Sequence, residues 1–250
     1  LLLAGFTTGG LITRIYRNTN GQLAADNSVS LHGIDRGSVE WGDYDADGNL
    51  DILLSGQDAN SNSITKIYKN SGGGVYSEVS ATGITGISFG QAAWVDFDSD
   101  GDLDVMISGT TGMAPNTGPK VSKLYRNNGS AFSEVFPNAF VGLNYCSMDF
   151  GDYDHDGDMD LLMCGFTNSN MAFTAIYQNN EISFDIVFDG VLPAVLEGKV
   201  MWGDTDNDGD LDIFISGNII SGNAKIAQVY NNTGAGFQPG QSFPEAGQST

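Results

Sequence analysis

The chain has 250 residues, of which 34 are glycines and only 16% are charged. This length suits one large β domain or two small ones, and the composition is typical of a turn-rich β protein rather than a helical or disordered one. The formal net charge of −21, without a basic stripe, argues against nucleic acid as a partner.

The first 30 residues or so predict the second, third and fourth strands of an incomplete repeat. Leu1-Leu2-Leu3-Ala4 has no basic start, unlike a signal peptide, and it aligns with the later strand at Ile52-Leu53-Leu54-Ser55. Because the chain begins in mid-repeat and without Met, we expect a mature or truncated piece. No apolar stretch approaches the 18 or so residues that span a bilayer, so we expect no membrane insertion.

A nine-residue motif then occurs four times, with aspartates at positions one, three, five and nine and a glycine at position six. Its copies begin at Asp43, Asp96, Asp152 and Asp204, which gives periods of 53, 56 and 52 residues. The four loops hold 19 of the 31 acidic residues. A period near 50 is typical of a solenoid or a propeller.

The spacing of these carboxylates indicates a bound divalent cation. Unit charges a few ångströms apart repel by roughly 1 kcal/mol even in water, and the glycine permits the sharp turn that gathers them. An all-oxygen donor set without Cys or His favours Ca²⁺ over Mg²⁺ and argues against zinc. An EF-hand would need a bidentate Glu at position 12, where the loops offer Leu54, Ile107, Met163 and Ile215.

Each repeat is predicted to contain four strands, with the aspartate loop between the first and the second. The first strand carries an aromatic residue that we interpret as a wedge between repeats, with carbohydrate stacking as the alternative: Trp41, Trp94, Phe150 and Trp202. The second strand is a short apolar run. The third ends in Tyr-x-Asn, at Tyr16, Tyr68, Tyr125, Tyr177 and Tyr230, and the fourth is more polar.

This decline in apolarity places the first strands near an axis and the fourth at the rim of a propeller blade. We therefore predict an all-β fold, a β-propeller of four-stranded antiparallel blades, with about five blades of which the first is incomplete. Residues 1–250 are expected to form one propeller domain or fragment, with repeat units at about 1–37, 38–90, 91–145, 146–198 and 199–250.

The repeats resemble the FG-GAP (VCBS-type) repeats of integrin alpha-chain propellers and of many secreted bacterial proteins. The stretch Trp41-Gly42-Asp43-Tyr44-Asp45-Ala46-Asp47-Gly48-Asn49-Leu50-Asp51 carries the resemblance, which extends over nearly the whole chain. Integrin propellers have seven blades, whereas this chain holds fewer than five complete ones. The resemblance says little about activity, because the fold serves adhesins, lectins and the propellers of some polysaccharide lyases.

The resemblance implies four Ca²⁺ sites, with side-chain ligands at positions one, three, five and nine and a backbone carbonyl at position seven. In chain order the ligands would be Asp43, Asp45, Asp47, Asn49 and Asp51; Asp96, Asp98, Asp100, Asp102 and Asp104; Asp152, Asp154, Asp156, Asp158 and Asp160; and Asp204, Asp206, Asp208, Asp210 and Asp212. Because calcium is abundant outside cells, we expect a secreted or cell-surface protein.

Ligand binding is predicted on the loops opposite the calcium sites, where the repeats vary most. These loops span Gln57–Ile64, Thr110–Val121, Thr167–Phe173 and Asn218–Lys225. Recognition commonly uses loops on a rigid scaffold, so we expect an extracellular binding or adhesion module for a glycan or a protein; tolerated surface loops are the plainer interpretation. Two other functions stay open: the propeller part of a carbohydrate-active enzyme such as a polysaccharide lyase, and a structural subunit whose open blade is completed by a neighbouring chain or a flanking domain.

Little in the sequence indicates catalysis. His155 lies between metal ligands and His32 in a connector, and neither accompanies a nucleophile signature, so no enzymatic activity is expected. Paired carboxylates for glycoside cleavage stay open, although most acidic residues are assigned to metal. Cys146 and Cys164 could form a disulfide in an oxidising compartment, but a buried free thiol is favoured because serine replaces Cys164 in the sister repeats.

Overall fold

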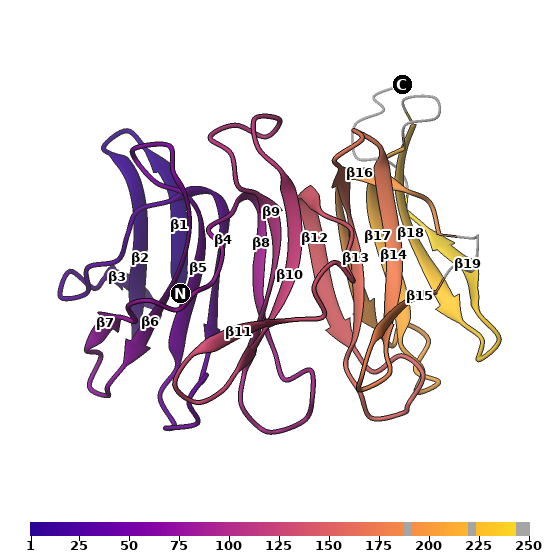
Figure 1. Ribbon diagram of the computed structural model, residues 1–250, viewed down its shortest axis with the longest axis horizontal. Coiled ribbons are helices and arrows are strands. Elements are labelled where there is room, and N and C mark those ends of the chain that lie inside the picture. Colours follow the sequence, from indigo (N-terminus) through magenta and orange to yellow (C-terminus); the bar gives the residue numbers. More distant parts are fainter. Residues whose placement is uncertain (188–191, 220–223, 244–250) are drawn as a thin grey trace. The chain divides into compact units, whose positions relative to one another are not determined.

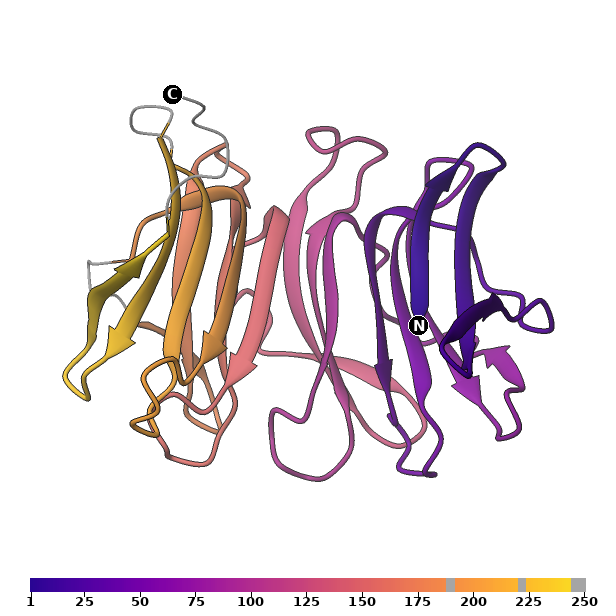
Figure 2. The same cartoon turned by 180° about the vertical axis from the view of Figure 1, so that it is seen from behind.

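The computed structural model describes residues 1–187, 192–219 and 224–243. Every regular element in these ranges is a β-strand, which confirms the all-β prediction. The strands form five antiparallel sheets, three-stranded in the first case and four-stranded in the others (Figures 1 and 2). Within the same ranges there is no helix long and apolar enough to cross a membrane.

Strand order within each sheet follows the chain. The first sheet contains β1 (Leu2–Thr7), β2 (Gly10–Thr19) and β3 (Gln22–Ala25). The second contains β4 (Asp35–Gly42), β5 (Asp51–Gln57), β6 (Ser63–Asn70) and β7 (Tyr76–Glu78). The third contains β8 (Ser88–Val95), β9 (Asp104–Thr110), β10 (Lys120–Asn127) and β11 (Phe132–Val135). The fourth contains β12 (Leu143–Gly151), β13 (Asp160–Thr167), β14 (Ala172–Asn179) and β15 (Phe184–Val187). The fifth contains β16 (Val195–Gly203), β17 (Asp212–Ile219), β18 (Ala224–Asn232) and β19 (Phe237–Ser242).

The chain divides into two compact units. One comprises Leu1–Asp96 and Asp100–Asn138 and holds the first three sheets, and the other comprises Phe97–Ser99 and Ala139–Thr250 and holds the last two. The first sheet lacks the strand that would precede β1, as the sequence predicted. In the other sheets, the first strands begin three or four residues before the approximate repeat boundaries drawn from the sequence, at Asp35, Ser88, Leu143 and Val195.

Each aspartate loop connects the first strand of a sheet to the second. The residue before the loop pairs with the ninth-position aspartate in every case: Gly42 with Asp51, Val95 with Asp104, Gly151 with Asp160 and Gly203 with Asp212. The predicted place of the loops is therefore confirmed. We call the aspartate loops the metal loops and this end of each sheet the metal end. The opposite end, with the loop between the second and third strands, is the loop end.

The hydrophobic core follows the predicted decline in apolarity. All residues of β5 and β9 are buried, whereas β7 and β11 have no buried residue. Burying a branched side chain such as that of Ile52, which has no exposed surface, stabilises the fold by about 1.5–3 kcal/mol. The second strands therefore anchor the sheets, and the ends of these anchored strands position the metal loops.

Aromatic rings pack between neighbouring sheets of the same unit. Tyr44 of the first loop stacks on Trp94 of β8, with ring centroids 5.7 Å apart and planes 3° apart. Tyr153 of the third loop stacks on Trp202 of β16 at 5.6 Å and 3°. The structural interpretation of these two tryptophans is thus confirmed, because each packs within a core cluster rather than offering an open face.

The two cysteines lie on adjacent strands as free thiols. Cys164 of β13 pairs with Ser147, the residue after Cys146 in β12. Burial raises the pKa of the Cys164 thiol to about 12, so this thiol is held in its protonated form. The structure thus agrees with the interpretation of Cys164 as a buried free thiol.

Candidate functional site

The backbone of the aspartate loops has two left-handed residues. Position four has a φ between 53° and 62°, at Ala46, Ser99, His155 and Asn207. The glycine at position six has a φ between 85° and 100°, at Gly48, Gly101, Gly157 and Gly209. Glycine adopts such values without a steric penalty, which explains why the sequence repeats it at the turn that reverses the loop.

The first aspartate of each loop organises this turn. Asp43 accepts hydrogen bonds from the backbone N–H groups of Asp47 at 3.0 Å and Gly48 at 2.9 Å. The equivalent pairs in the other three loops have lengths of 3.1 to 3.3 Å. Each carboxylate is therefore oriented by its own loop.

The ninth aspartate is fully buried in all four loops: Asp51, Asp104, Asp160 and Asp212. Asp51 Oδ1 accepts a hydrogen bond from the backbone N–H of Asn70 in β6 at 2.7 Å, and Oδ2 accepts one from Tyr44 at 3.2 Å. The third-strand asparagines of the other sheets donate in the same way at 2.7 to 2.9 Å. The Tyr-x-Asn ending therefore holds the buried carboxylate of its own sheet.

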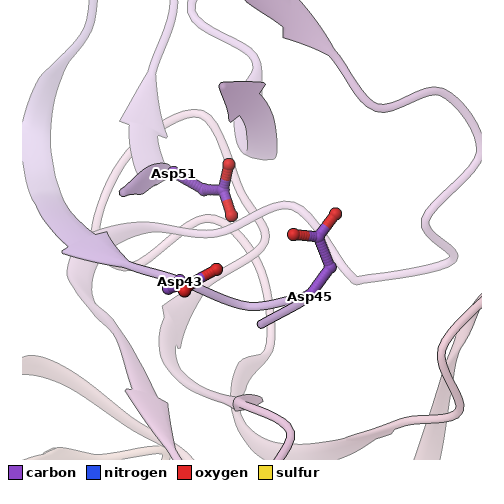
Figure 3. Close-up of side chains that lie close together, drawn as sticks. All are labelled: Asp43, Asp45 and Asp51. Carbon is purple, nitrogen blue, oxygen red and sulfur yellow. The ribbon is translucent and has the colours of Figure 1, made fainter. Parts of the chain in front are cut away.

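Three of the predicted ligand side chains come together in each loop. One carboxylate oxygen from each of positions one, three and nine lies within 4.8 Å of the other two. Figure 3 shows the first such group, Asp43, Asp45 and Asp51. The other groups are Asp96, Asp98 and Asp104; Asp152, Asp154 and Asp160; and Asp204, Asp206 and Asp212. Each group could hold one metal ion.

The predicted ligands at positions five and seven are arranged differently. Asp47 Oδ1 accepts hydrogen bonds from the backbone N–H and the side-chain amide of Asn49, at 2.9 and 2.8 Å. In the other loops, the position-five carboxylates of Asp100, Asp156 and Asp208 accept the backbone N–H of position seven at 3.0 Å. Position five is outside the clusters of three, so its role as a ligand, and that of the position-seven carbonyl, stay predictions.

The electrostatics of the clusters fit a cation. Burial raises the pKa of Asp51, and the charges of Asp45 and Asp47 raise it further. Burial likewise raises the pKa of Asp160 to about 7. Asp45 Oδ1 is buried and accepts no hydrogen bond from the described part of the chain. A hard divalent ion among these oxygens would satisfy that atom and offset the repulsion, so the residues suit Ca²⁺ as predicted.

The metal loops also join neighbouring sheets within a unit. Asn127 Nδ2 of β10 donates to the backbone carbonyl of Tyr44 in the preceding metal loop at 2.8 Å. Asn232 Nδ2 of β18 donates to the carbonyl of Tyr153 at 3.1 Å. Together with the stacked rings, these bonds make the first and third loops part of the contact between neighbouring sheets.

The loop end contains a repeated β-bulge that the sequence analysis missed. Register shifts lie at the same place in all four first strands, for example between Asp35 and Ser38. One residue in each bulge has a left-handed φ of 47° to 52°, although none is glycine: Arg36, Phe89, Tyr145 and Glu197. We call these the bulge residues. Such a conformation costs about 1–2 kcal/mol per residue, and bulges often re-aim a side chain next to a functional site.

A glycine after the bulge residue is the sequence signal that could have revealed it. A Cβ atom on Gly37 would lie 1.8 Å from the Ser55 carbonyl oxygen, and one on Gly90 would lie 1.9 Å from that of Ser108. Only glycine avoids this contact in those sheets. In the fourth sheet Cys146 takes this place, which hides the pattern from a simple comparison of repeats.

A pocket of about 550 Å³ opens at the loop end of the first unit. Its lining includes Phe6, which is 75% exposed, and the bulge residue Arg36. Arg36 Nη1 donates to Gln57 Oε1 at 3.1 Å and lies 3.1 Å from Asp35 Oδ1. Asp35 Oδ1 is a buried atom, and among the described residues it is held by this ion pair rather than by a hydrogen bond. Asp58 completes the polar wall, and it is 8% exposed.

The predicted ligand-binding loops contribute unequally to this pocket. The loop Gln57–Ile64 lines it directly. The loop Thr110–Val121 approaches it, because Gln57 Nε2 donates to the backbone carbonyl of Met113. The loop Thr167–Phe173 belongs to the second unit, and part of the fourth loop, residues 220–223, lies outside the described residues.

The two histidines have structural contacts. His155 Nε2 lies 3.1 Å from the Gly209 carbonyl oxygen, and its Nδ1 lies 3.7 Å from Asp210 Oδ1. The backbone N–H of His32 donates to the Tyr68 hydroxyl at 3.0 Å. His155 therefore connects the third and fourth metal loops, next to a pocket of about 470 Å³ at the metal end of the second unit.

No family model and no curated protein sequence matches the chain. Among solved structures, it is similar to a point mutant of Aleuria aurantia lectin in complex with alpha-methyl-L-fucoside. The TM-score is 0.51 at 12% identity, over 97% of this chain and 77% of the lectin. It also matches a protein of Bifidobacterium bifidum s17 provisionally named an exo-beta-1,3-galactanase, with a TM-score of 0.47, 14% identity, and coverage of 98% and 76%.

The similarity to the lectin confirms the predicted fold class, an all-β chain whose sheets have the organisation of propeller blades. At this identity the likeness shows the fold alone. The FG-GAP resemblance, which the repeated loops carry, stays a prediction.

Proposed function

We propose that the chain is a secreted, calcium-stabilised propeller module of the FG-GAP type that binds a neutral glycan at its loop end and has no catalysis of its own. The observation that carries the proposal is the loop-end pocket of the first unit, where an exposed aromatic ring lies beside a guanidinium and a carboxylate that form an ion pair. Phe6, Arg36 and Asp35 supply these three features.

This combination of groups suits a sugar. An exposed ring such as Phe6 can pack against the apolar C–H face of a pyranose, and the polar groups around it can bond the hydroxyls that fix orientation. The partly exposed Asp35 carboxylate can accept a hydrogen bond from a hydroxyl, whereas Arg36 can donate one. Because Arg36 is already positioned by Gln57 and Asp35, little side-chain entropy would be lost on binding.

The charge of the pocket favours a neutral glycan over an acidic one. Among the described residues that line it, Arg36 is the single cation, while Asp35 and Asp58 are both carboxylates. A uronic acid brought to this wall would meet net negative charge, which costs binding energy at close range. The alternative of a lyase on acidic polysaccharides is therefore less well supported than a lectin-like role.

Calcium would act at a distance from this pocket. Bound at the metal end, it would neutralise the clustered carboxylates and hold the first two strands of each sheet together, which keeps the loop end in its binding conformation. Thermodynamically it would stabilise the folded state because the assembled clusters exist only there.

Binding should be measured with the full chain in calcium, first on a glycan array and then by calorimetry. Alpha-methyl-L-fucoside is a reasonable first probe because the structurally similar lectin was solved with it. A uronic acid oligosaccharide serves as the acidic comparison. We expect micromolar to millimolar binding to a neutral sugar, and about tenfold or greater loss in Phe6→Ala and in Arg36→Ala, which corresponds to about 1.4 kcal/mol.

Val75→Ala is the matched control, since Val75 is a similarly exposed apolar residue, 64% exposed, near β7 in the same unit. It should leave binding unchanged. Equal binding by the parent and both pocket variants would rule out this pocket, and cleavage of the acidic oligosaccharide would favour the enzymatic alternative.

A further inference from the structure

One side chain of the third strand contacts the metal loop in the first, third and fourth of the complete repeats. It is the middle residue of the Tyr-x-Asn ending: Lys69, Gln178 and Asn231, with Arg126 at the same sequence position in the other repeat. Lys69 Nζ forms an ion pair with Asp45 and lies 3.4 Å from Asp47 Oδ2. The first loop thus contains a tethered ammonium group next to two of its carboxylates.

The third and fourth loops have a neutral amide in this place. Gln178 Nε2 donates to Asp154 Oδ2 at 2.5 Å, and Asn231 Nδ2 donates to Asp206 Oδ2 at 3.0 Å. The contacted carboxylate is again that of position three. The geometry of the contact is therefore shared among these loops, while its charge differs.

The formal charge of the loops differs accordingly. The first loop has four aspartates, because Asn49 stands at position seven, and Lys69 reduces its net charge to −3. The fourth loop has five aspartates and the neutral Asn231, which leaves −5. Lys69 is about one-third exposed and Asp45 about one-fifth, so water screens their attraction only in part.

We propose that Lys69 acts as a built-in cation that weakens calcium binding by the first loop and holds its carboxylates together when calcium is scarce. The loops would then fill in order of charge, the third and fourth before the first. A calcium ion entering the first loop must compete with the ammonium group for Asp45, whereas in the other two loops it displaces at most a hydrogen bond from an amide. This inference rests on the proposed calcium binding and adds the order in which the loops bind calcium.

The test exchanges the two side chains between loops. Calcium alone is titrated into the full chain after chelation, and the affinities of the separate sites are measured by calorimetry. In Lys69→Gln we expect the weakest site to bind about tenfold more tightly or better. In Gln178→Lys, one of the tight sites should weaken by a similar factor.

Two controls separate charge from packing. Lys69→Arg keeps the positive charge and should keep the weak site. Without calcium, Lys69→Gln should melt at a lower temperature than the parent, because its carboxylates lose their cation, whereas Gln178→Lys should melt higher. A packing defect at residue 69 would lower the melting temperature with calcium and without it.

The outcomes distinguish this inference from the proposed function. If calcium binds but both exchanges leave every affinity unchanged, the role of Lys69 is wrong and calcium stabilisation stands. If the parent binds no calcium at all, the calcium stabilisation in the proposed function is wrong, and so is the inference about Lys69. Should Lys69→Gln fail to fold, Gln178→Lys still decides, since its site lies on the exposed side of a loop that folds without a cation from the third strand.

Discussion

At the metal end of the sheets the repeats share both backbone and side chains, whereas at the loop end they share only the backbone. The four aspartate loops have the same left-handed positions, the same two backbone hydrogen bonds to position one, and the same hydrogen bond from the third-strand Asn to position nine. The four bulges have the same register shift and nearly the same φ, but their bulge residues are Arg, Phe, Tyr and Glu. Uniform side chains indicate a task common to the four sheets that have an aspartate loop, and varied side chains on a uniform backbone indicate specialisation.

Removal of calcium should give the largest effect, because it acts on all the metal loops at once. Each independent site adds RT ln(1 + [L]/Kd), or about 2.7 kcal/mol when calcium is at 100 times Kd. We therefore expect EGTA to lower the melting temperature by about 10 °C or more. Magnesium at the same concentration should restore little of this loss, and superimposable melting curves with and without calcium would refute the function of the metal end.

Substitution of one buried aspartate should give the second-largest loss of stability. In Asp160→Ala, the backbone N–H groups of Asn179 and Tyr153 lose their acceptor, at roughly 1–3 kcal/mol each, and a proposed calcium ligand is lost as well. The matched control is Asp158→Asn in the same loop, which should change stability by less than about 0.5 kcal/mol if position seven acts through its carbonyl. Urea unfolding in saturating calcium measures both, and a large effect of the control would assign a ligand role to the Asp158 side chain.

At the loop end, the difference in stability between a glycine and an alanine variant at the same position tests whether the backbone is strained. Because Arg36 has a φ of 52°, Arg36→Gly should be about 1 kcal/mol more stable than Arg36→Ala, although both lose the same side-chain contacts. Val39, in the same strand, is the control, and there glycine should be the less stable of the two by about 0.5–1 kcal/mol. Chemical denaturation of the four variants gives the answer. An alanine advantage at both positions would mean that the bulge is not strained.

The smallest expected effect is a pH dependence of stability. It comes from a carboxylate that lies between two sheets of the second unit. Burial raises the pKa of Asp149, whose Oδ2 accepts the backbone N–H of Trp202 at 2.8 Å. Because the pKa of Asp149 is raised in the folded state, its contribution to stability is greatest below the ordinary aspartate pKa of 3.8 and falls as pH rises through the pKa of the folded state. Asp149→Asn keeps an acceptor without ionising.

The stability of Asp149→Asn relative to the parent should therefore increase between pH 4 and pH 8. Denaturant unfolding at several pH values measures this difference, with calcium saturating throughout. Asp185→Asn, at an exposed position of β15, is the control and should give a flat difference. A flat difference for Asp149→Asn as well would show that this carboxylate is not destabilised by burial.

Much of the metal end could be predicted because its determinants are local. The spacing of Asp43, Asp45 and Asp51 within nine residues, and the glycine at Gly48, define a turn whatever surrounds it. The apolar run after each loop similarly predicts a buried second strand. The incomplete first sheet could be inferred as well, since the third-strand ending occurs five times and the loop four times.

The contacts of the third strand could not be predicted in the same way. That Lys69 reaches Asp45, or that Asn127 reaches the carbonyl of Tyr44, depends on residues 24 and 83 positions apart. Sequence spacing gives no direct measure of such distances. They follow from the pairing of the first three strands in one sheet and from the packing of one sheet on the next.

From the sequence alone came the β class, the repeat, the place of the four loops and their carboxylate chemistry, because alternating apolar residues and clustered like charges restrict a chain within a few residues. Only the tertiary structure decided which carboxylates meet, which third-strand side chains contact the metal loops, and where the bulges lie. The reason is that these arrangements depend on strand register and sheet packing, where a shift of a single residue would move every side chain to the opposite face.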